Sequence, residues 1–484
     1  MNYQNKLVLI CTLIIAAFAL YCYNPFVLYF QNDDFVHIPL SAEGVLLQHN
    51  TFRPVCDLSI MLDYFLWGKT AWGYHLTNLL LHIMCSILLF FFLKLILRKY
   101  FHLAQTTWVC WLSSLLFFIY AMHSEAVFWI LGRSAMLGAL FSLLFLFCYI
   151  KKYDSKIYVA GSIIFFISSL LSYESAWVLP FICIIIGIAE TRINKITVKS
   201  EAKYWSLIVG VFILLILIRL HFIHEVIGNY EASALLEGNV AVLAKNFFQL
   251  ILRSFLPAFS NNAFLIAVFI VIETTILICF LRLKKQERTK ALLIFICFLI
   301  SLLPYCSLGI DTHGTESERF LYFPALILCI FFGVVIHLTQ KINTTFKYLL
   351  FAALFICHLI VLAGNGNNYR FAGNINKLIV AELQKLHNKK IIYAESVPQA
   401  QNGALILRSG LPEIAKSFIT DSRIDTVIVC SQRNELKPLR PSYKVEYVNT
   451  WEMNCKNIAI QKDSFEQKNA TFFRFTDSVL YITK

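Results

Sequence analysis

Long apolar runs alternate with short polar connections along the first three quarters of the chain. Each run has roughly 15–25 predominantly apolar residues, about the length at which a helix crosses a bilayer. This pattern predicts an all-α polytopic membrane domain over residues 1–364, with about 11 transmembrane helices. The expected spans are Leu7–Phe30, Gly73–Leu97, Thr107–His123, Ser134–Ile150, Ile157–Leu171, Ser175–Ala189, Trp205–Leu220, Ala263–Leu281, Ala291–Leu308, Phe320–Leu338 and Tyr348–Gly364.

The pattern changes after residue 364. Apolar residues recur at helical spacing over Phe371–His387, which predicts an amphipathic helix. Short β-branched or aromatic runs follow, with a helical segment between two of them at Leu411–Phe418. We therefore expect a small soluble α/β domain over residues 365–484. Its strands are predicted at Ile391–Tyr393, Ala404–Leu407, Thr426–Val429, Tyr443–Val448, Ile458–Ile460, Phe472–Phe475 and Val479–Ile482.

Composition supports a membrane protein and argues against a nucleic-acid-binding one. Hydrophobic residues make up 58% of the chain and charged residues 15%, against roughly 45–50% and 25% in soluble domains. The formal net charge is +13, but the cations lie in the connections between apolar runs. No basic soluble module with interleaved aromatic residues accompanies them, so no nucleic-acid partner is expected.

The distribution of Lys and Arg predicts the orientation. Cation-rich connections alternate with cation-poor ones, and cation-rich connections usually face the cytoplasm. The N-terminus is then inside, whereas the Asp33–Asp34 loop and residues 365–484 are extracytoplasmic. The absence of a retention signal in the sequence favours a bacterial inner membrane. The cation-rich group comprises Lys6, Arg98–Lys99, Lys151–Lys156, Arg192–Lys203, Arg282–Lys290 and Lys341–Lys347.

The positions of the cysteines do not indicate a catalytic or metal-binding site. Most of the 14 cysteines lie inside apolar runs, where they behave as small hydrophobic residues. Cys430 and Cys455 lie in the polar tail and could form a disulfide outside the cytoplasm. The first apolar run has no small-residue cleavage site before Asp33, so we interpret it as a retained span.

An acidic pair directly follows the first apolar run. Asp33 and Asp34 stand where a membrane helix meets water, and adjacent like charges resist joint ionisation when buried. A solvated helix end is one interpretation of the pair. A general base that deprotonates an acceptor hydroxyl is the other. A divalent ion, Mg²⁺ or Mn²⁺, could bind Asp33 and Asp34, but the sequence does not require a cofactor.

Further polar residues recur at the outer ends of other apolar runs. An arginine at an outer end could bind a phosphate through two parallel hydrogen bonds of its guanidinium. A nearby carboxylate could orient that arginine. Simpler roles stay open: a snorkelling arginine for Arg133, a helix cap for Glu174, a backbone hydrogen bond for His123 and a local ion pair for Glu318–Arg319. The candidate substrate-binding residues are Arg53, His123, Arg133, Glu174, Arg319 and Tyr322, and Glu125 joins Asp33 and Asp34 as a catalytic candidate.

Four segments resemble one family. Arg53-Pro54, followed by the run from Trp72-Gly73-Tyr74-His75 to His82, is similar to the second-span signature of the transmembrane and tetratricopeptide-repeat O-mannosyltransferases and their bacterial relatives. His123-Ser124-Glu125-Ala126-Val127-Phe128-Trp129-Ile130-Leu131-Gly132-Arg133 resembles their His-x-Glu-Ala-Val-x-Trp-Ile-x-Gly-Arg run. Leu171–Ser175 and Glu318–Pro324 resemble two further stretches. Together the matches cover roughly residues 30 to 340.

The resemblance implies a fold and an activity. It implies the C-type glycosyltransferase fold (GT-C) and transfer of a sugar, mannose being one candidate, from a polyprenyl-phosphate donor to an extracytoplasmic protein hydroxyl, glycan or lipid. Asp33 or Asp34 would be the base, with Asp33 favoured by the family's acidic pair. Arg133 and Arg319 would hold the leaving phosphate, and Glu125 would orient one of them or the acceptor.

The sequence departs from the family in two places, and other functions stay open. No tetratricopeptide repeats follow the last span, and Tyr173 stands where the family usually has Lys. The alternatives are a polysaccharide polymerase or ligase, a transporter or flippase for lipid-linked sugars, and a non-catalytic scaffold. A transporter would favour charges at the bilayer midplane and an inverted repeat, and neither is evident here.

Overall fold

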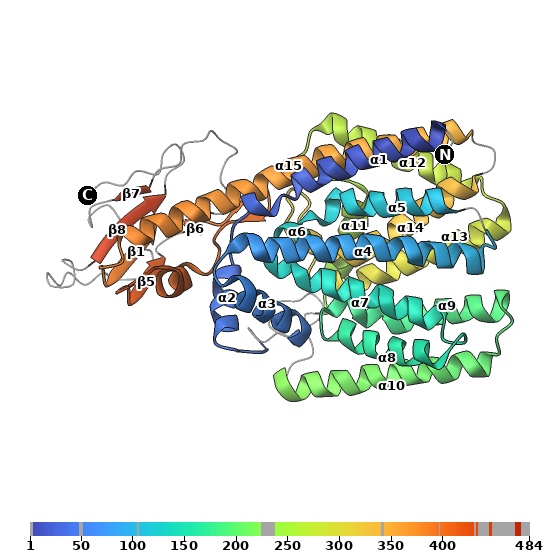
Figure 1. Ribbon diagram of the computed structural model, residues 1–484, viewed down its shortest axis with the longest axis horizontal. Helices are drawn as coiled ribbons and strands as arrows, with labels where there is room; N and C mark the ends of the chain where they lie inside the picture. Colours follow the sequence, from blue (N-terminus) through green and yellow to red (C-terminus); the bar gives the residue numbers. More distant parts are fainter. Residues whose placement is uncertain are drawn as a thin grey trace.

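The protein is described by a computed structural model, in which a bundle of long helices carries a small β-sheet at one end (Figure 1). The structure describes residues 3–47, 52–103, 106–223, 238–339, 343–395, 397–429, 432–433, 445–447 and 470–475. Its long helices are α1 (Tyr3–Cys22), α4 (Ala71–Tyr100), α5 (Thr107–Ile119), α7 (Arg133–Ile150), α8 (Lys156–Leu170), α9 (Leu179–Ile193), α10 (Val198–Ile223), α12 (Ala263–Leu281), α13 (Lys285–Leu302), α14 (Tyr322–Leu338) and α15 (Thr344–Lys385).

Apolar helices occupy all eleven predicted span positions. Among the described residues, eight helices are long and apolar enough to cross a membrane. A ninth is a broken pair, Thr107–Ile119 and Ala121–Phe128, bent by 52°. Leu13–Val27 and Lys156–Leu170 are shorter apolar helices at the two remaining positions. The prediction of a polytopic all-α membrane part is therefore confirmed.

Local sequence signals set several helix ends. Pro54 opens α3, and Pro180 lies in the first turn of α9, where a missing N–H breaks no hydrogen bond. Ser155, Asn262 and Asn343 cap α8, α12 and α15, because each side chain accepts a hydrogen bond from a backbone N–H of the first turn.

Short helices lie between the spans on the side of the β-sheet. They include α2 (Asp34–Ala42) and α3 (Pro54–Trp67) in the first outer loop, α6 (Ser124–Phe128) and the amphipathic α11 (Val240–Phe255). Single turns complete the connections: η1 (Pro25–Val27), η3 (Ala121–His123), η4 (Ile130–Gly132), η5 (Glu174–Val178), η6 (Leu303–Tyr305) and η7 (Glu318–Leu321).

Helix α14 forms the centre of the bundle. In its most apolar window 94% of the residues are buried, against 11% in the peripheral α10. A close approach to α5 requires Gly333, because a Cβ atom built there would overlap the Ser113 side chain. Of the polar candidates described below, Arg319 lies in the turn η7 directly before this helix and Tyr322 is its first residue.

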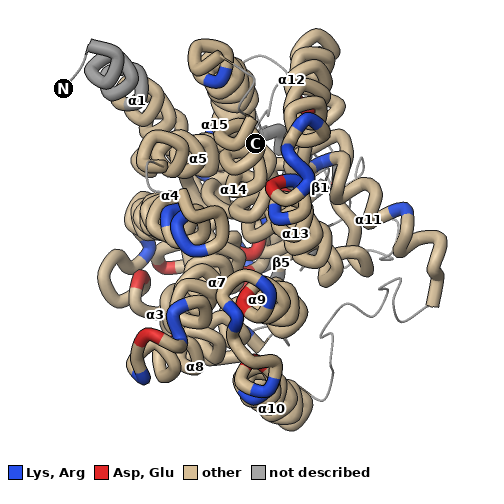
Figure 2. The backbone as a smooth tube through the Cα atoms, turned by 90° about the vertical axis from the view of Figure 1, so that its right-hand side faces the viewer, with Lys and Arg blue, Asp and Glu red and all other residues tan. Residues whose placement is uncertain are grey.

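Cations gather at the end of the bundle opposite the β-sheet. Figure 2 looks onto this end and shows Lys and Arg at the ends of α4, α9, α10 and α13. The described cation-rich connections at the ends of α4, α9, α10 and α13 thus lie on one side of the molecule, as the alternation predicted.

Helix α15 joins the bundle to the sheet without interruption. It has 42 residues and passes straight through the predicted domain boundary at 364/365 (Figure 1). The expected helix Phe371–His387 is therefore the outer part of a membrane helix, and it ends at Lys385. The division into two domains stays a prediction.

The C-terminal part is a small α/β unit, as predicted. Its main sheet has the order β5-β1-β8-β7, with β1 parallel to β5 and β8 and with β7 antiparallel to β8. The strands are β1 (Ile391–Glu395), β2 (Val397–Pro398), β3 (Ala400–Gln401), β4 (Ala404–Leu405), β5 (Thr426–Val429), β6 (Gln432–Arg433), β7 (Val445–Tyr447) and β8 (Ala470–Phe475).

The connection between β4 and β5 contains the expected helical segment. It consists of α16 (Leu411–Glu413) and a π-helical turn, η8 (Ile414–Phe418). The predicted strands Ile458–Ile460 and Val479–Ile482 lie outside the described residues, as do Cys430 and Cys455.

Candidate active site

The structure separates the two members of the acidic pair. Asp34 is the first residue of α2 and is fully buried, with the Gln31 backbone N–H donating to its Oδ2 at 2.8 Å. Burial raises the pKa of Asp34 well above the usual carboxyl range. Asp33 is only partly buried, and its Oδ1 accepts a hydrogen bond from the Ser409 hydroxyl. Asp33 is therefore the member that faces the outer surface.

Glu125 and Arg319 form one predicted pair. The Arg319 guanidinium lies 2.6 Å from Glu125 Oε1, and the Arg319 backbone N–H donates to Oε2 at 2.9 Å. The guanidinium also lies 5.0 Å from the centre of the Trp129 ring and 4.9 Å from that of Phe320. Because one fifth of the Arg319 side chain stays exposed, this arginine is held in place yet accessible. Glu125 thus holds the Arg319 side chain in place, and its role in the reaction stays a prediction.

Glu318 turns away from its neighbour Arg319. Its Oε1 lies 2.6 Å from the guanidinium of Arg253, and Ser124 donates to its Oε2 at 3.0 Å. Both members of the Arg253–Glu318 pair are buried. The interpretation of Glu318–Arg319 as a local ion pair is therefore wrong, because each residue pairs with a distant partner. Arg253 was not among the candidates.

Arg53 and Glu174 meet beside a cavity. The Arg53 Nη2 and Nε atoms lie 2.8 and 3.1 Å from Glu174 Oε2, and the guanidinium of Arg219 approaches Oε1 at 3.3 Å. Tyr173 stacks under Arg53 at 4.7 Å, so this departure from the family has a packing role. Two guanidiniums, from Arg53 and Arg219, thus share the Glu174 carboxylate.

The cavity beside this cluster has a volume of about 460 Å³. Its polar rim is Arg53 and Glu174, and apolar side chains from α11 and η6 form most of its remaining wall. Phe320 also lines it, so the ring that stacks on Arg319 borders the same space. A ligand with a charged head and an apolar tail suits such a lining.

Arg133 lies in a different environment from the one predicted. Its side chain is fully buried, and its guanidinium lies 2.5 Å from Asp63 Oδ2. The remaining donors bind Asn78 Oδ1 at 2.8 Å, Tyr74 O at 2.9 Å and the Ser59 hydroxyl at 3.1 Å. These contacts join α3, α4 and α7. The geometry therefore assigns Arg133 to packing and gives no support to direct phosphate binding or to snorkelling.

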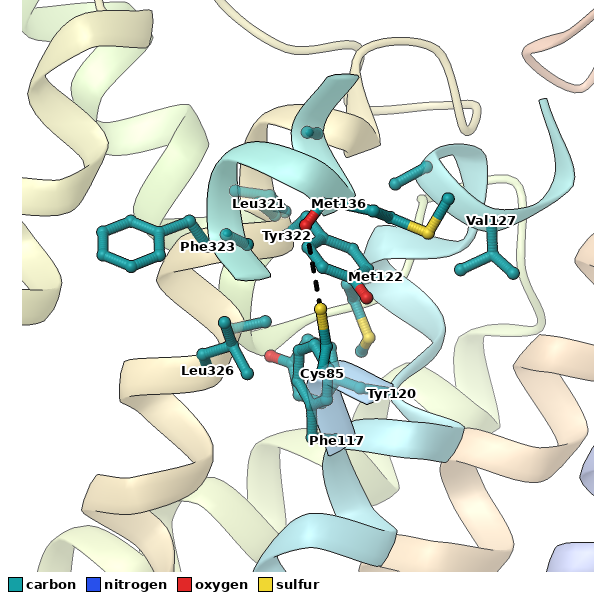
Figure 3. Close-up of a cluster of buried hydrophobic side chains, with 14 of the residues drawn as sticks. Cys85, Phe117, Tyr120, Met122, Val127, Met136, Leu321, Tyr322, Phe323 and Leu326 are labelled. Atoms are coloured by element: carbon teal, nitrogen blue, oxygen red, sulfur yellow. Dashed lines mark hydrogen bonds between the residues drawn. The ribbon is translucent and has the colours of Figure 1, made fainter. Parts of the chain in front are cut away.

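His123 and Tyr322 are also interior residues. Both are fully buried, with ring centres 4.8 Å apart, and His82 Nδ1 lies 2.8 Å from the Tyr322 hydroxyl. Figure 3 shows Tyr322 among the apolar side chains of this cluster, where the Cys85 thiol points at the Met136 carbonyl, 3.7 Å away. The structure thus places neither His123 nor Tyr322 on the outer surface.

The C-terminal part supplies polar residues that the sequence analysis missed. We call residues 402–410 the strap. Arg408 binds Glu316 through two bonds of 2.8 and 2.9 Å, and the backbone N–H groups of Arg408 and Ser409 donate to Asn32 Oδ1. In the sequence, the polar residues Arg408 and Ser409 directly follow an apolar run and precede Gly410. This pattern only weakly indicates a polar turn near the site.

The sequence left open a divalent ion at Asp33 and Asp34, and that ion stays a prediction. Among the described residues, no group of three or more His, Cys, Asp or Glu side chains is placed to hold one. Asp33 and Asp34 take different partners, namely the Ser409 hydroxyl and the Gln31 backbone, so they do not form a two-carboxylate site in this conformation. No step below is routed through a metal ion.

The fold and the site together define a multi-pass membrane protein with a polar outer site and a small α/β part beside it. The sequence is similar to protein O-mannosyl-transferase TMTC2 of Homo sapiens, with 34% identity over 28% of this chain and 15% of the relative. It is also similar to protein O-mannosyl-transferase TMTC3 of Homo sapiens, with 25% identity over 65% of this chain and 38% of the relative. These matches confirm the resemblance drawn from the motifs.

The limits of the similarity are clear. The chain spans less than half the length of these two relatives. No protein-family model matches it. Among solved structures, ArnT from Cupriavidus metallidurans bound to undecaprenyl phosphate is similar at a TM-score of 0.49 and 11% identity, over 86% of this chain and 89% of that one.

Proposed function

We propose that the protein is an integral-membrane glycosyltransferase that moves a sugar from a polyprenyl-phosphate donor to an acceptor hydroxyl at the outer face. The observation that carries the proposal is the cavity lined by Arg53, Glu174 and Phe320, whose remaining walls are largely apolar, with Arg219 bound to the same Glu174 carboxylate. The phosphate of the donor would bind at the charged rim of the cavity. Its prenyl chain would lie along the apolar wall and extend towards the bilayer. The similarity to O-mannosyl-transferases makes mannose the first sugar to try.

The proposed reaction is a single inverting displacement. Asp33 takes the proton of the acceptor hydroxyl, whose oxygen forms a bond to the anomeric carbon. The bond from that carbon to the phosphate oxygen breaks, and the electron pair leaves with the polyprenyl phosphate. Arg53, Arg219 and Arg319 stabilise the charge that develops on the phosphate, with Glu174 and Glu125 fixing their orientation.

A transfer assay tests this function directly. Purified protein in liposomes should release polyprenyl phosphate from polyprenyl-phosphate mannose and place labelled sugar in a host membrane extract supplied as the source of acceptors. A transporter would move the donor across the bilayer without consuming it. Donor that is moved but not cleaved would therefore refute the transferase and favour the flippase.

We expect Arg53→Lys to raise the KM for the donor by about tenfold, with the acceptor KM unchanged. A lysine ammonium is a point charge and cannot reproduce the two-pronged contact of a guanidinium. The measurement is initial-rate kinetics at varied donor concentration. Arg98→Lys, an exposed arginine at the far end of α4, is the matched control. Equal donor KM values in the two variants would show that Arg53 only anchors Glu174.

We also propose that the outer site and the C-terminal part are extracytoplasmic, because the cation-rich end is opposite them. We expect an impermeant maleimide to label Lys385→Cys in intact cells, and Lys285→Cys only after permeabilisation, with the wild-type chain as the background. Both positions are exposed. The reverse pattern would invert the orientation and move the site inside. The TMTC2 and TMTC3 relatives are human proteins, so a bacterial inner membrane stays a prediction from sequence.

A further inference from the structure

The strap bridges two outer loops that are far apart in the sequence. The Thr315 backbone N–H donates to the Asn402 carbonyl at 3.1 Å, and Arg408 binds Glu316 through both carboxylate oxygens. Gly403 lies against this loop so closely that an added Cβ atom would come within 2.1 Å of the Thr315 nitrogen. The strap is therefore docked by its backbone as well as by its side chains.

Asn32 anchors the other edge of the strap. Its backbone N–H donates to the Ile406 carbonyl at 2.8 Å, and its Oδ1 accepts from the N–H groups of Arg408 and Ser409 at 2.9 and 3.0 Å. Asn32 has a positive φ of 45°, a conformation that asparagine tolerates better than most residues. This backbone turn lets a single residue hold the strap directly beside Asp33.

The anchored strap places one hydroxyl on the proposed base. Ser409 Oγ donates to Asp33 Oδ1, and its other neighbour is Asn32 Oδ1 at 3.3 Å. A general base must lie about 2.6–3.2 Å from the hydroxyl that it deprotonates. The Ser409 hydroxyl therefore takes, on Asp33, the position that an acceptor hydroxyl needs for transfer.

The side-chain contacts of Arg408 and Ser409 can be replaced by contacts with an incoming ligand. Arg408 and Ser409 are exposed, and the Arg408 and Glu316 side chains are 45% and 32% exposed. Exposed ion pairs and hydrogen bonds contribute little free energy. An incoming hydroxyl can thus displace the Ser409 side chain while Asn32 and Thr315 keep hold of the strap backbone.

We propose that Ser409 is a built-in pseudo-acceptor, whose hydroxyl occupies Asp33 until an acceptor hydroxyl replaces it. This proposal rests on the proposed function of the site. The contact protects the donor sugar, because water that reached Asp33 in the absence of an acceptor would be activated by the same carboxylate. The strap thereby suppresses wasteful hydrolysis of the lipid-linked sugar.

The test uses water as the probe acceptor. The full-length protein in liposomes is given polyprenyl-phosphate mannose without an acceptor, and release of free mannose is followed. Ser409→Ala should hydrolyse the donor about three- to tenfold faster than wild type, whereas Ser409→Thr, which keeps the hydroxyl, should resemble wild type. Ser206→Ala, at an exposed serine on α10, is the matched control. The gain should disappear in Ser409→Ala/Asp33→Asn, because it depends on the freed carboxylate.

Each other outcome overturns the proposal. Unchanged hydrolysis in Ser409→Ala would show that the hydroxyl blocks nothing. Slower hydrolysis would show that Ser409 positions Asp33 productively. A mass increase of one hexose on Ser409 in the wild-type chain would show that it is a true acceptor. Wild-type protein that neither hydrolyses nor transfers the donor sugar would refute the proposed function itself, so the two failures are distinguishable.

Discussion

Asp33→Asn should lower the rate of sugar transfer by about 10²–10⁴-fold while the protein level stays the same. A general base contributes about this factor, and asparagine keeps the shape of aspartate but not its basicity. The Ser409 hydroxyl can still hydrogen-bond to the new amide oxygen, so the strap should remain in place. The measurement is the turnover of polyprenyl-phosphate mannose by purified protein in liposomes.

Asp34→Asn is the matched control for this variant. Asp34 is buried and its pKa is raised, so its neutral form already prevails over a wider pH range than usual. Asparagine is also neutral, and turnover should therefore stay within a few-fold of wild type. If Asp34→Asn is the inactive variant and Asp33→Asn the active one, the assignment of the base is reversed. If both keep wild-type turnover, neither carboxylate is the base.

Arg133→Met should destabilise the folded protein by about 3–5 kcal/mol, because it leaves the buried Asp63 without its partner. Burial already raises the pKa of Asp63, and the positive charge of Arg133 opposes that rise. Without Arg133 the folded-state pKa climbs further, so the loss of stability should grow as pH rises through that value. The measurement is thermal unfolding in detergent as a function of pH.

Two comparisons decide whether this effect is local. Asp63→Asn in the Arg133→Met background should restore part of the stability, because no buried charge then remains. Lys385→Met, which removes an exposed ion pair with Glu382, should change the stability by no more than about 1 kcal/mol. An Arg133→Met protein that is as stable as wild type but has a raised donor KM would return Arg133 to the phosphate site.

The sequence predicted the architecture well because hydrophobic run length and loop charge depend only on local residues. All eleven span positions and the strands β1 and β5 follow from such patterns. The break in the third span was not predictable, since no Pro or Gly marks the bend between Ile119 and Ala121. The path of α15 through residue 364 was also missed, because a change in composition there looked like a domain boundary.

The sequence singled out Asp33, Glu125, Arg53 and Arg319 because they are charged residues in the connections between apolar runs, and their roles stay predictions. The sequence did not reveal those site residues whose role depends on burial or on a partner far away in the chain. Ser409 reaches Asp33 across a separation of 376 residues, and no local pattern encodes that contact. Arg253 left one readable signal. It shares helical spacing with the buried Leu250 on α11, so it had to face the interior.

Helix α15 has a mechanical consequence for the outer site. At 1.5 Å per residue its 42 residues make a rod about 60 Å long. Its outer part contacts both the segment before Asp33 and the strap, since Asn376 donates to the carbonyls of Phe30 and Ile406 at 2.9 Å each. A 10° change in tilt about the inner end would displace the far end by about 10 Å. The tilt of a membrane helix depends on bilayer thickness, which depends on lipid composition. A change of lipid composition would therefore shift the position of the strap relative to the bundle.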